Sequence, residues 1–184
     1  WTERRYQHNP PVELAEAGAK IILNISASPW HLGKNKTRFE MLRSIAQKTR
    51  RPVVFCNQVG GNDELIFDGS SLAFNARGEL IAQGKWFEDD FVVVDTESKT
   101  SIRPIELDAE EAIYKALTLG LRDYFYKCGF KSAVLGLSGG IDSAVTACIA
   151  VAALGRGNVR GVSLPSQFSS QHSLDDARAL AEKL

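Results

Sequence analysis

The sequence predicts an α/β protein in two parts, the second of which begins a doubly wound parallel sheet. The prediction rests on apolar, strand-like runs that alternate with segments of helical period in both halves of the chain. A polar stretch at residues 95–104, which ends in proline, separates the halves and is typical of a linker. The length of 184 residues falls between one domain and two, and 44% hydrophobic content indicates a globular protein.

The first half is predicted to combine αβ units with an antiparallel meander. A helix is expected at residues 10–18, a strand at 20–24 and a loop at 25–34. Apolar residues at helical spacing predict a second helix at 35–48, and an apolar run predicts a strand at 53–56. Turn residues then separate three short strands, which we expect at 71–75, 79–83 and 91–94.

The second half is predicted to alternate helices with parallel strands. A long helix is expected at 108–127 and a strand at 133–137, and a helix then runs to about residue 154. A strand at 159–164 and a helix from Ser173 follow, in the order that gives right-handed crossovers. Two strands cannot form a stable sheet alone. We therefore expect this sequence to be an excerpt from a longer protein.

A phosphate-binding loop is predicted where the strand at 133–137 meets the next helix. Gly139 and Gly140 lack Cβ atoms, so the backbone can take positive φ and a ligand can approach its amides closely. Those amides and the start of the helix form a cradle for a phosphate chain, to which Ser138 and Ser143 add hydroxyl donors. Asp142 adds an oxygen ligand suited to Mg²⁺. We therefore expect this loop to bind ATP with magnesium.

Two other phosphate-binding loops are excluded by the residues present. No lysine follows the glycines, as a Walker loop requires, and the spacing does not fit the dinucleotide-binding pattern GxGxxG. The remaining pattern, SGGIDS, resembles the pyrophosphate loop of the ATP pyrophosphatases, which cleave ATP between its α and β phosphates. A turn that merely joins strand to helix is the structural alternative.

Composition gives no indication of nucleic-acid or membrane binding. Acidic and basic residues number 22 each, so no net charge attracts an anionic polymer or membrane surface. No apolar run approaches the length of about 20 residues that spans a bilayer, and no segment resembles a signal peptide. We therefore expect a cytoplasmic protein without nucleic-acid or membrane partners.

The three cysteines and three histidines form no recognisable metal or disulfide pattern. Cys56, Cys128 and Cys148 are each expected to fill small apolar spaces.

Longer stretches of the sequence resemble a known family. NISASPWHLGKNKTRFEML and VVFCNQVGGNDELIFDGSS are similar to the closing part of a nitrilase-like glutaminase domain. Together with SGGIDS and LPSQFSSQHSLDDARALAEKL, they resemble the glutamine-dependent NAD synthetases over essentially the whole chain. The resemblance implies the end of a nitrilase-like αββα sandwich at 1–95 and a linker at 96–106. It also implies the start of an adenine nucleotide α-hydrolase-like domain at 107–184.

The resemblance implies a carbon–nitrogen ligase of NAD biosynthesis that uses glutamine as amido donor. Such enzymes adenylate the carboxylate of deamido-NAD with ATP and Mg²⁺, and ammonia from glutamine then displaces AMP. A cytoplasmic homo-oligomer is also implied. The ATP-binding positions of the family fall on Gly136, Leu137, Ser138, Gly139, Gly140, Ile141, Asp142 and Ser143, with Asp142 as the metal ligand.

The glutamine-binding positions of the family fall on Ser28 and Lys34. A hydroxyl and a cation six residues apart on one loop suit the polar end of an amino acid. A capping serine and a solvated lysine remain the alternative interpretation.

The chain departs from the family pattern in two respects. The glutaminase Glu, Lys and Cys of the family all precede the matching region, so no catalytic residue of that site is expected here. Cys56 is no substitute, because an apolar strand end offers a thiol neither a base nor a positive environment. Gln167 stands where similar enzymes often carry arginine, and we expect weaker nucleotide contacts from it.

Two alternative functions remain open. One is another amidotransferase with a pyrophosphate loop, although such enzymes lack stretches like ASPWHLGK and NQVGGNDELIFDG. The other is a non-catalytic module that binds a nucleotide without turnover.

Overall fold

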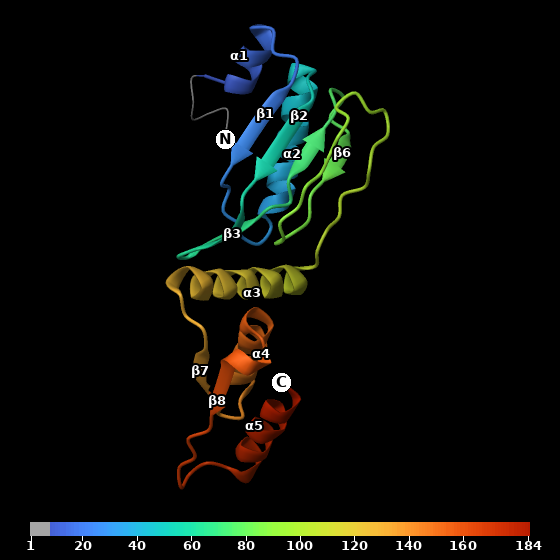
Figure 1. The fold of residues 1–184 in the computed structure, drawn as a ribbon. Helices are drawn as coiled ribbons and strands as arrows, with labels where there is room; N and C mark the ends of the chain where they lie inside the picture. The colour runs from blue at the N-terminus through green and yellow to red at the C-terminus, as the bar shows by residue number, and fades with distance from the viewer. Residues whose placement is uncertain (1–7) are drawn as a thin grey trace. The chain divides into compact units, whose positions relative to one another are not determined.

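The structure is a computed structural model that describes residues 8–184, and it contains two compact units (Figure 1). The first unit comprises the residues up to Gly60 together with Leu65–Ala112. The second comprises Gly61–Glu64 and Ile113–Leu184. The predicted domain of residues 1–95 begins outside the described residues, and the predicted domain boundaries stay a prediction.

The first unit is built on a four-stranded mixed sheet (Figure 1). Its strands lie in the order β1 (Ile22–Ser26), β2 (Val53–Asn57), β5 (Leu72–Phe74) and β6 (Leu80–Gln83). β1 and β2 are parallel, whereas β5 is antiparallel to both β2 and β6. The short helix α1 (Pro10–Glu16) precedes β1, and α2 (Lys34–Thr49) connects β1 to β2. These elements confirm the expected αβ unit and the antiparallel pairing of the first two strands of the expected meander.

The core of this unit lies between α2 and one face of the sheet. Strand alternation directs Val53 and Phe55 toward the helix, and both side chains are almost fully buried. Burial of one such side chain contributes about 2 kcal/mol. The core consists of Ile22, Leu42, Ala46, Val53, Phe55, Leu72, Phe74 and Leu80.

Two sequence-based expectations for the first unit are wrong. The sequence predicts no strand between residues 57 and 70, but β3 (Val59–Asn62) and β4 (Leu65–Asp68) pair as a two-stranded sheet. Conversely, no strand forms at residues 91–94, where Phe91 and Val93 are 90% and 83% exposed. The apolar composition of this segment favours a strand, but it pairs with no other described strand.

The second unit contains the long helix α3 (Ala109–Cys128) and a parallel pair of strands. β7 (Ala133–Gly136) pairs with β8 (Val159–Val162), and α4 (Ile141–Leu154) with the short 3₁₀-helix η1 (Arg156–Asn158) connects them. The last helix, α5 (Gln171–Lys183), follows β8. The buried residues of this unit include Leu137, Ala147 and Ala177. The parallel pairing confirms the prediction from strand–helix alternation.

The start of α5 differs from the predicted start. The helix was expected to begin at Ser173, whereas it begins two residues earlier. Ser170 is the capping residue, and its hydroxyl accepts a hydrogen bond from the Ser173 amide at 3.2 Å. The sequence SSQHS offers several capping residues, so composition alone does not select among them. Within residues 8–184, no helix has the length and apolarity needed to cross a membrane.

Candidate functional site

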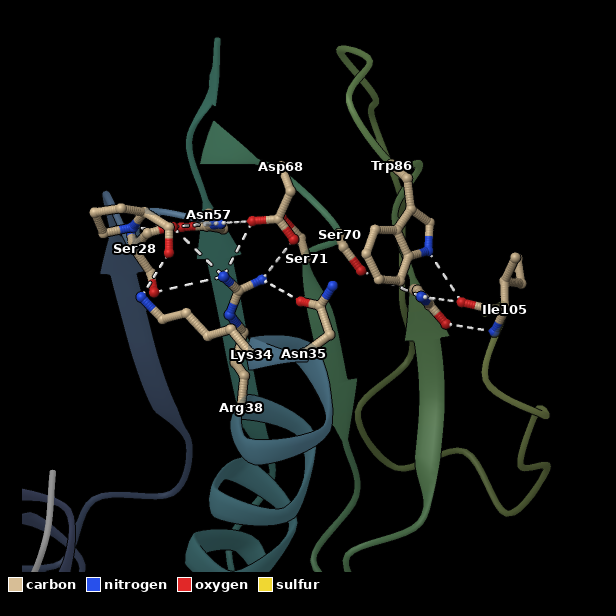
Figure 2. Close-up of polar contacts among 12 residues, drawn as sticks. Ser28, Lys34, Asn35, Arg38, Asn57, Asp68, Ser70, Ser71, Trp86 and Ile105 are labelled. Atoms are coloured by element: carbon tan, nitrogen blue, oxygen red, sulfur yellow. Dashed lines mark hydrogen bonds and ion pairs between the residues drawn. The ribbon is translucent and has the colours of Figure 1, made fainter. Parts of the chain in front are cut away.

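Polar side chains of the first unit gather at one edge of its sheet (Figure 2). Because β1 and β2 are parallel, the loop after β1 and the end of β2 lie at the same edge. β5 runs in the opposite direction, so the residues that precede it reach this edge as well. The carboxyl ends of parallel strands are the usual location of ligand sites in α/β folds. The topology therefore brings Ser28, Asn57 and Asp68 together.

The loop between β1 and α2 is fixed at Trp30. The Trp30 amide donates to the Ile66 carbonyl at 2.6 Å, and the indole makes an edge-on contact with Phe87 at 5.5 Å between ring centroids. Gly33 then takes a φ of +81°, which most residues avoid, and this turn starts α2 at Lys34. The Trp30 contacts and the Gly33 turn thus fix the conformation of the loop that carries Ser28 and leads to Lys34.

Ser28 is tied to the ends of two other elements. Its amide donates to Asn57 Oδ1 at 2.9 Å. Arg38 Nη2 lies 3.4 Å from its carbonyl oxygen and 3.5 Å from its hydroxyl oxygen. The guanidinium only donates hydrogen bonds, so the hydroxyl oxygen faces it as an acceptor. The hydroxyl hydrogen of Ser28 thereby remains available to a ligand oxygen.

Lys34 extends from the start of α2 toward the loop that carries Ser28 (Figure 2). Its ammonium donates to the Pro29 carbonyl at 2.5 Å. Burial lowers the pKa of Lys34, and the nearby Arg38 lowers it further, whereas Asp68 opposes both effects. The positive end of the α2 dipole also disfavours a cation here. An anionic group bound beside Lys34 would relieve these costs.

A buried ion pair lies beneath this loop. Arg38 and Asp68 form two hydrogen bonds of 2.8 and 3.0 Å, and their side chains are 3% and 0% exposed. The Arg38 guanidinium carbon also lies 5.4 Å from the Phe55 ring centroid, a cation–π distance. Its Nε is buried and has no hydrogen-bond partner among the described residues. Asn57 Nδ2 donates to Asp68 at 3.2 Å and completes the cluster.

Sequence reasoning missed Arg38, Asn57 and Asp68. One signal was present, because Arg38 lies four residues before Leu42 on the apolar face of the predicted helix. A charge in that position predicts a buried partner. Asp68 gave no such signal, since Asp68-Gly69 also reads as an ordinary turn.

In the second unit, the predicted phosphate loop joins β7 to α4 as expected. Gly139 takes a φ of +82°, but Gly140 has an ordinary φ of −88°, so the expectation of positive φ holds for the first glycine only. Gly140 is instead the N-cap of α4, in extended conformation. A Cβ on Gly139 would lie 2.2 Å from the Ser173 carbonyl oxygen. Any larger residue at position 139 would therefore be strained by the positive φ and would clash with the start of α5.

The serines of this loop hold its shape. Ser138 and Ser143 hydroxyls lie 3.1 Å apart, and the Ser138 hydroxyl accepts from the Gly140 amide at 3.2 Å. The Ser143 hydroxyl accepts from the Ser138 amide and donates to the Gly140 carbonyl at 2.9 Å. The amides of the first turn of α4 have no intrahelical acceptors. Since Ser138, Gly140, Ile141 and Asp142 are exposed, the loop is open to an anion.

Asp142 is an exposed carboxylate in the first turn of α4. Within the described part of the chain, no group of three or more His, Cys, Asp or Glu side chains is arranged to hold a metal ion. Mg²⁺ often binds proteins through one or two carboxylates and takes its other ligands from phosphates and water. A single carboxylate beside the predicted phosphate loop fits this mode of binding.

A pocket of about 340 Å³ lies at the ends of β7 and β8, against α5. Leu137, which opens the phosphate loop, and Ala177 provide apolar walls, whereas Ser163 and Arg178 provide polar ones. The remaining lining residues are Gly161, Pro165, Leu174 and Ala181. Sequence reasoning did not predict this pocket, because its walls come from three separate elements. Gln167 is exposed in the segment between β8 and α5.

The expectation of buried cysteines is wrong for two of the three. Cys56 and Cys128 are exposed, and Cys148 is half-buried. Strand alternation turns Cys56 to the face of β2 opposite the core, which neighbouring apolar residues do not reveal.

Comparisons with known proteins agree with this two-part organisation. Residues 2–104 match the carbon–nitrogen hydrolase family model, and residues 113–184 match the NAD synthase model. The chain therefore belongs to the carbon–nitrogen hydrolase family, and the residues that follow are similar to the NAD synthase family. This combination, in this order, confirms the resemblance to the glutamine-dependent NAD synthetases.

Individual relatives carry the same two segments. The chain is 44% identical to glutamine-dependent NAD(+) synthetase of Synechocystis sp. over all of its own length and 34% of that protein. It is 41% identical to that of Aquifex aeolicus, over 94% of the chain and 37% of the relative. Glutamine-dependent NAD+ synthetase from Acinetobacter baumannii, solved in complex with ADP, is 36% identical and superimposes with a TM-score of 0.86. That superposition covers 93% of this chain and 34% of the solved chain. The chain thus spans about a third of these relatives.

Proposed function

We propose that the chain is part of an enzyme that amidates deamido-NAD to NAD through an adenylated intermediate, with glutamine as the source of ammonia. The proposal rests on the paired family matches and on relatives named glutamine-dependent NAD synthetases. Residues 1–95 would then belong to the glutaminase domain, 96–106 to a linker, and 107–184 to the synthetase domain. The neutral net charge agrees with small-molecule substrates, and we propose a cytoplasmic homo-oligomer.

The observation that carries the proposal is the exposed glycine loop at the start of α4. The segment from Gly136 through Leu137, Ser138, Gly139 and Gly140 would hold the phosphate chain of ATP, and Ile141, Asp142 and Ser143 would contribute the amides of the first helical turn. The amides of the first helical turn have no intrahelical acceptors and so suit an anion, and the serine hydrogen bonds already fix the shape of the loop.

The pocket beside the loop suits the adenine base. Its apolar walls, Leu137 and Ala177, match the faces of a purine, and Ser163 and Arg178 offer hydrogen bonds at the rim. Asp142 would hold Mg²⁺, whose charge offsets that of the phosphates during transfer. Gln167 donates and accepts hydrogen bonds but carries no charge, so it would bind a phosphate more weakly than an arginine would.

The chemical logic is that of carboxylate activation. A free carboxylate is a poor electrophile, and attaching AMP to it creates a good leaving group for attack by ammonia. Most free ammonia is protonated at neutral pH, so a glutaminase site that releases it locally raises the usable supply. In the first unit, Ser28 and Lys34 would bind glutamine, with the Lys34 ammonium beside its carboxylate.

The proposal is tested by isotope transfer in the full-length protein. Deamido-NAD labelled with ¹⁸O in the nicotinate carboxylate is supplied with ATP, magnesium and either glutamine or ammonia. Adenylation places one labelled oxygen in the phosphate of AMP, whichever nitrogen source is used. NAD formed with unlabelled AMP, or no NAD with either source, contradicts the proposal.

A further inference from the structure

Asp68 is fully excluded from solvent, so it cannot itself contact a small-molecule ligand. Its carboxylate nevertheless accepts hydrogen bonds from two side chains that both reach Ser28. Arg38 donates two of them, and Asn57 donates the third at 3.2 Å. The function proposed above gives this buried carboxylate no role.

The first route from Asp68 to Ser28 passes through Asn57. A carboxylate only accepts hydrogen bonds, so it turns the amide nitrogen of Asn57 toward itself. Asn57 Oδ1 consequently faces the Ser28 amide, from which it accepts at 2.9 Å. The reversed amide would place oxygen against the carboxylate and a donor against the Ser28 N–H. Asp68 thus determines which way Asn57 holds the Ser28 backbone.

The second route passes through Arg38. The bidentate pair with Asp68 fixes the plane of the guanidinium, and Nη2 lies 3.4 and 3.5 Å from the two Ser28 oxygens. Because the Ser28 hydroxyl accepts on that side, its hydrogen is directed to another acceptor. A ligand oxygen, such as one of a carboxylate, satisfies this requirement, whereas an ammonium or amide N–H does not.

We propose that Asp68 is a positioning residue for glutamine, which acts through Asn57 and Arg38 to hold Ser28 as a hydrogen-bond donor to the substrate. This inference rests on the proposed function, because it concerns the same glutamine site. It adds that the cluster of Arg38, Asn57 and Asp68 determines how tightly glutamine binds. Substitutions in this cluster should not affect ATP-dependent synthesis from ammonia.

The test compares Asp68→Asn with wild type in the full-length protein. Loss of the carboxylate frees the Asn57 amide and the guanidinium, and we expect KM for glutamine to rise about tenfold, the effect of one lost hydrogen bond. The kcat of ammonia-dependent NAD formation is expected to stay within about twofold of wild type. Arg77→Gln, which breaks the exposed Arg77–Glu79 pair of the same unit, is the matched control and leaves both values unchanged.

A Ser28→Ala background shows whether Asp68 acts through Ser28. In that background, Asp68→Asn is expected to change KM for glutamine by less than about twofold, since the two substitutions remove one interaction. A full additional increase overturns the inference, and so does an equal loss of ammonia-dependent and glutamine-dependent rates. If Asp68→Asn does not fold, Arg38→Lys makes the same comparison, because it keeps the charge and loses the fork. Failure of the proposed function is distinct, since wild type itself would then form no NAD.

Discussion

Arg38 and Asp68, thirty residues apart in the sequence, form a bidentate ion pair from which solvent is almost completely excluded. The pair joins the first turns of α2 to the end of β4, beneath the loop that carries Ser28. A buried charge that loses its partner is costly, whereas an apolar pair of similar volume is often tolerated. The pair therefore makes the first unit sensitive to single substitutions.

Arg38→Ala is expected to lower the free energy of unfolding by about 3–5 kcal/mol, because it leaves Asp68 buried without a counter-charge. Urea unfolding followed by tryptophan fluorescence measures this, since Trp30 lies in the same unit. Arg77→Ala, at an exposed ion pair, is expected to unfold at nearly the wild-type urea concentration. The double variant Arg38→Met with Asp68→Leu recovers much of the loss. Equal midpoints for Arg38→Ala and Arg77→Ala would show that the pair is not buried as described.

Gly139→Ala is expected to weaken ATP binding at least tenfold. Positive φ costs an alanine about 1–2 kcal/mol, and the added Cβ would also meet the Ser173 carbonyl oxygen at 2.2 Å. Gly155→Ala is the matched control, because Gly155 has a φ of +84° and no atom within 4 Å of its added Cβ. Calorimetric titration with ATP should show at least tenfold weaker binding for the first variant only. Unchanged affinity in Gly139→Ala would contradict the placement of the loop.

The lowered pKa of Lys34 predicts a specific pH dependence for the proposed glutamine site. Burial and Arg38 lower this pKa from 10.5, so the ammonium loses its proton at a lower pH than free lysine does. If the charged form binds the glutamine carboxylate, KM for glutamine rises with increasing pH, beginning below pH 10.5. In the Lys34→Arg variant the side chain stays charged over this pH range. Titration of glutamine affects both proteins equally, so the ratio of the wild-type KM to the variant KM reports on Lys34 alone. A ratio that does not vary with pH contradicts this role.

Asp142→Ala is expected to abolish magnesium-dependent synthesis while sparing glutamine hydrolysis. The carboxylate stands at the start of α4, where it is exposed and beside the phosphate loop. NAD formation and glutamate release are measured in parallel on the full-length protein. Asp176→Ala, which removes an exposed carboxylate of α5, serves as control and retains both activities. Equal loss of the two activities in Asp142→Ala would refute the division of roles between the units.

The sequence predicted elements with strong local patterns. The 3.6-residue period marked α2, α3 and α4, and the apolar runs marked β1, β2, β7 and β8. The hairpin of β3 and β4 was missed because its glycines resemble a loop, and a strand was wrongly expected at 91–94 because composition does not supply a pairing partner. The first error concerns a local pairing across two residues, whereas the second reflects the lack of a long-range pairing partner.

The candidate sites were predictable to a similar extent. The predicted phosphate loop is local in sequence, and its segment lies between β7 and α4 as expected. The cluster of Arg38, Asn57 and Asp68 is assembled from α2, β2 and β4, and no local pattern records that assembly. The packing of Gly139 against Ser173 is likewise a contact between distant segments, so the sequence indicates the positive φ and the ligand approach of this glycine but not its contact with α5.

We propose that the loop from Gly136 to Ser143 holds the pyrophosphate portion of ATP, so that cleavage falls between the α and β phosphates. The most direct measurement identifies the nucleotide product when the full-length protein converts deamido-NAD with ATP, magnesium and ammonia. One AMP and one pyrophosphate are expected for each NAD formed. Formation of ADP and inorganic phosphate instead would contradict it.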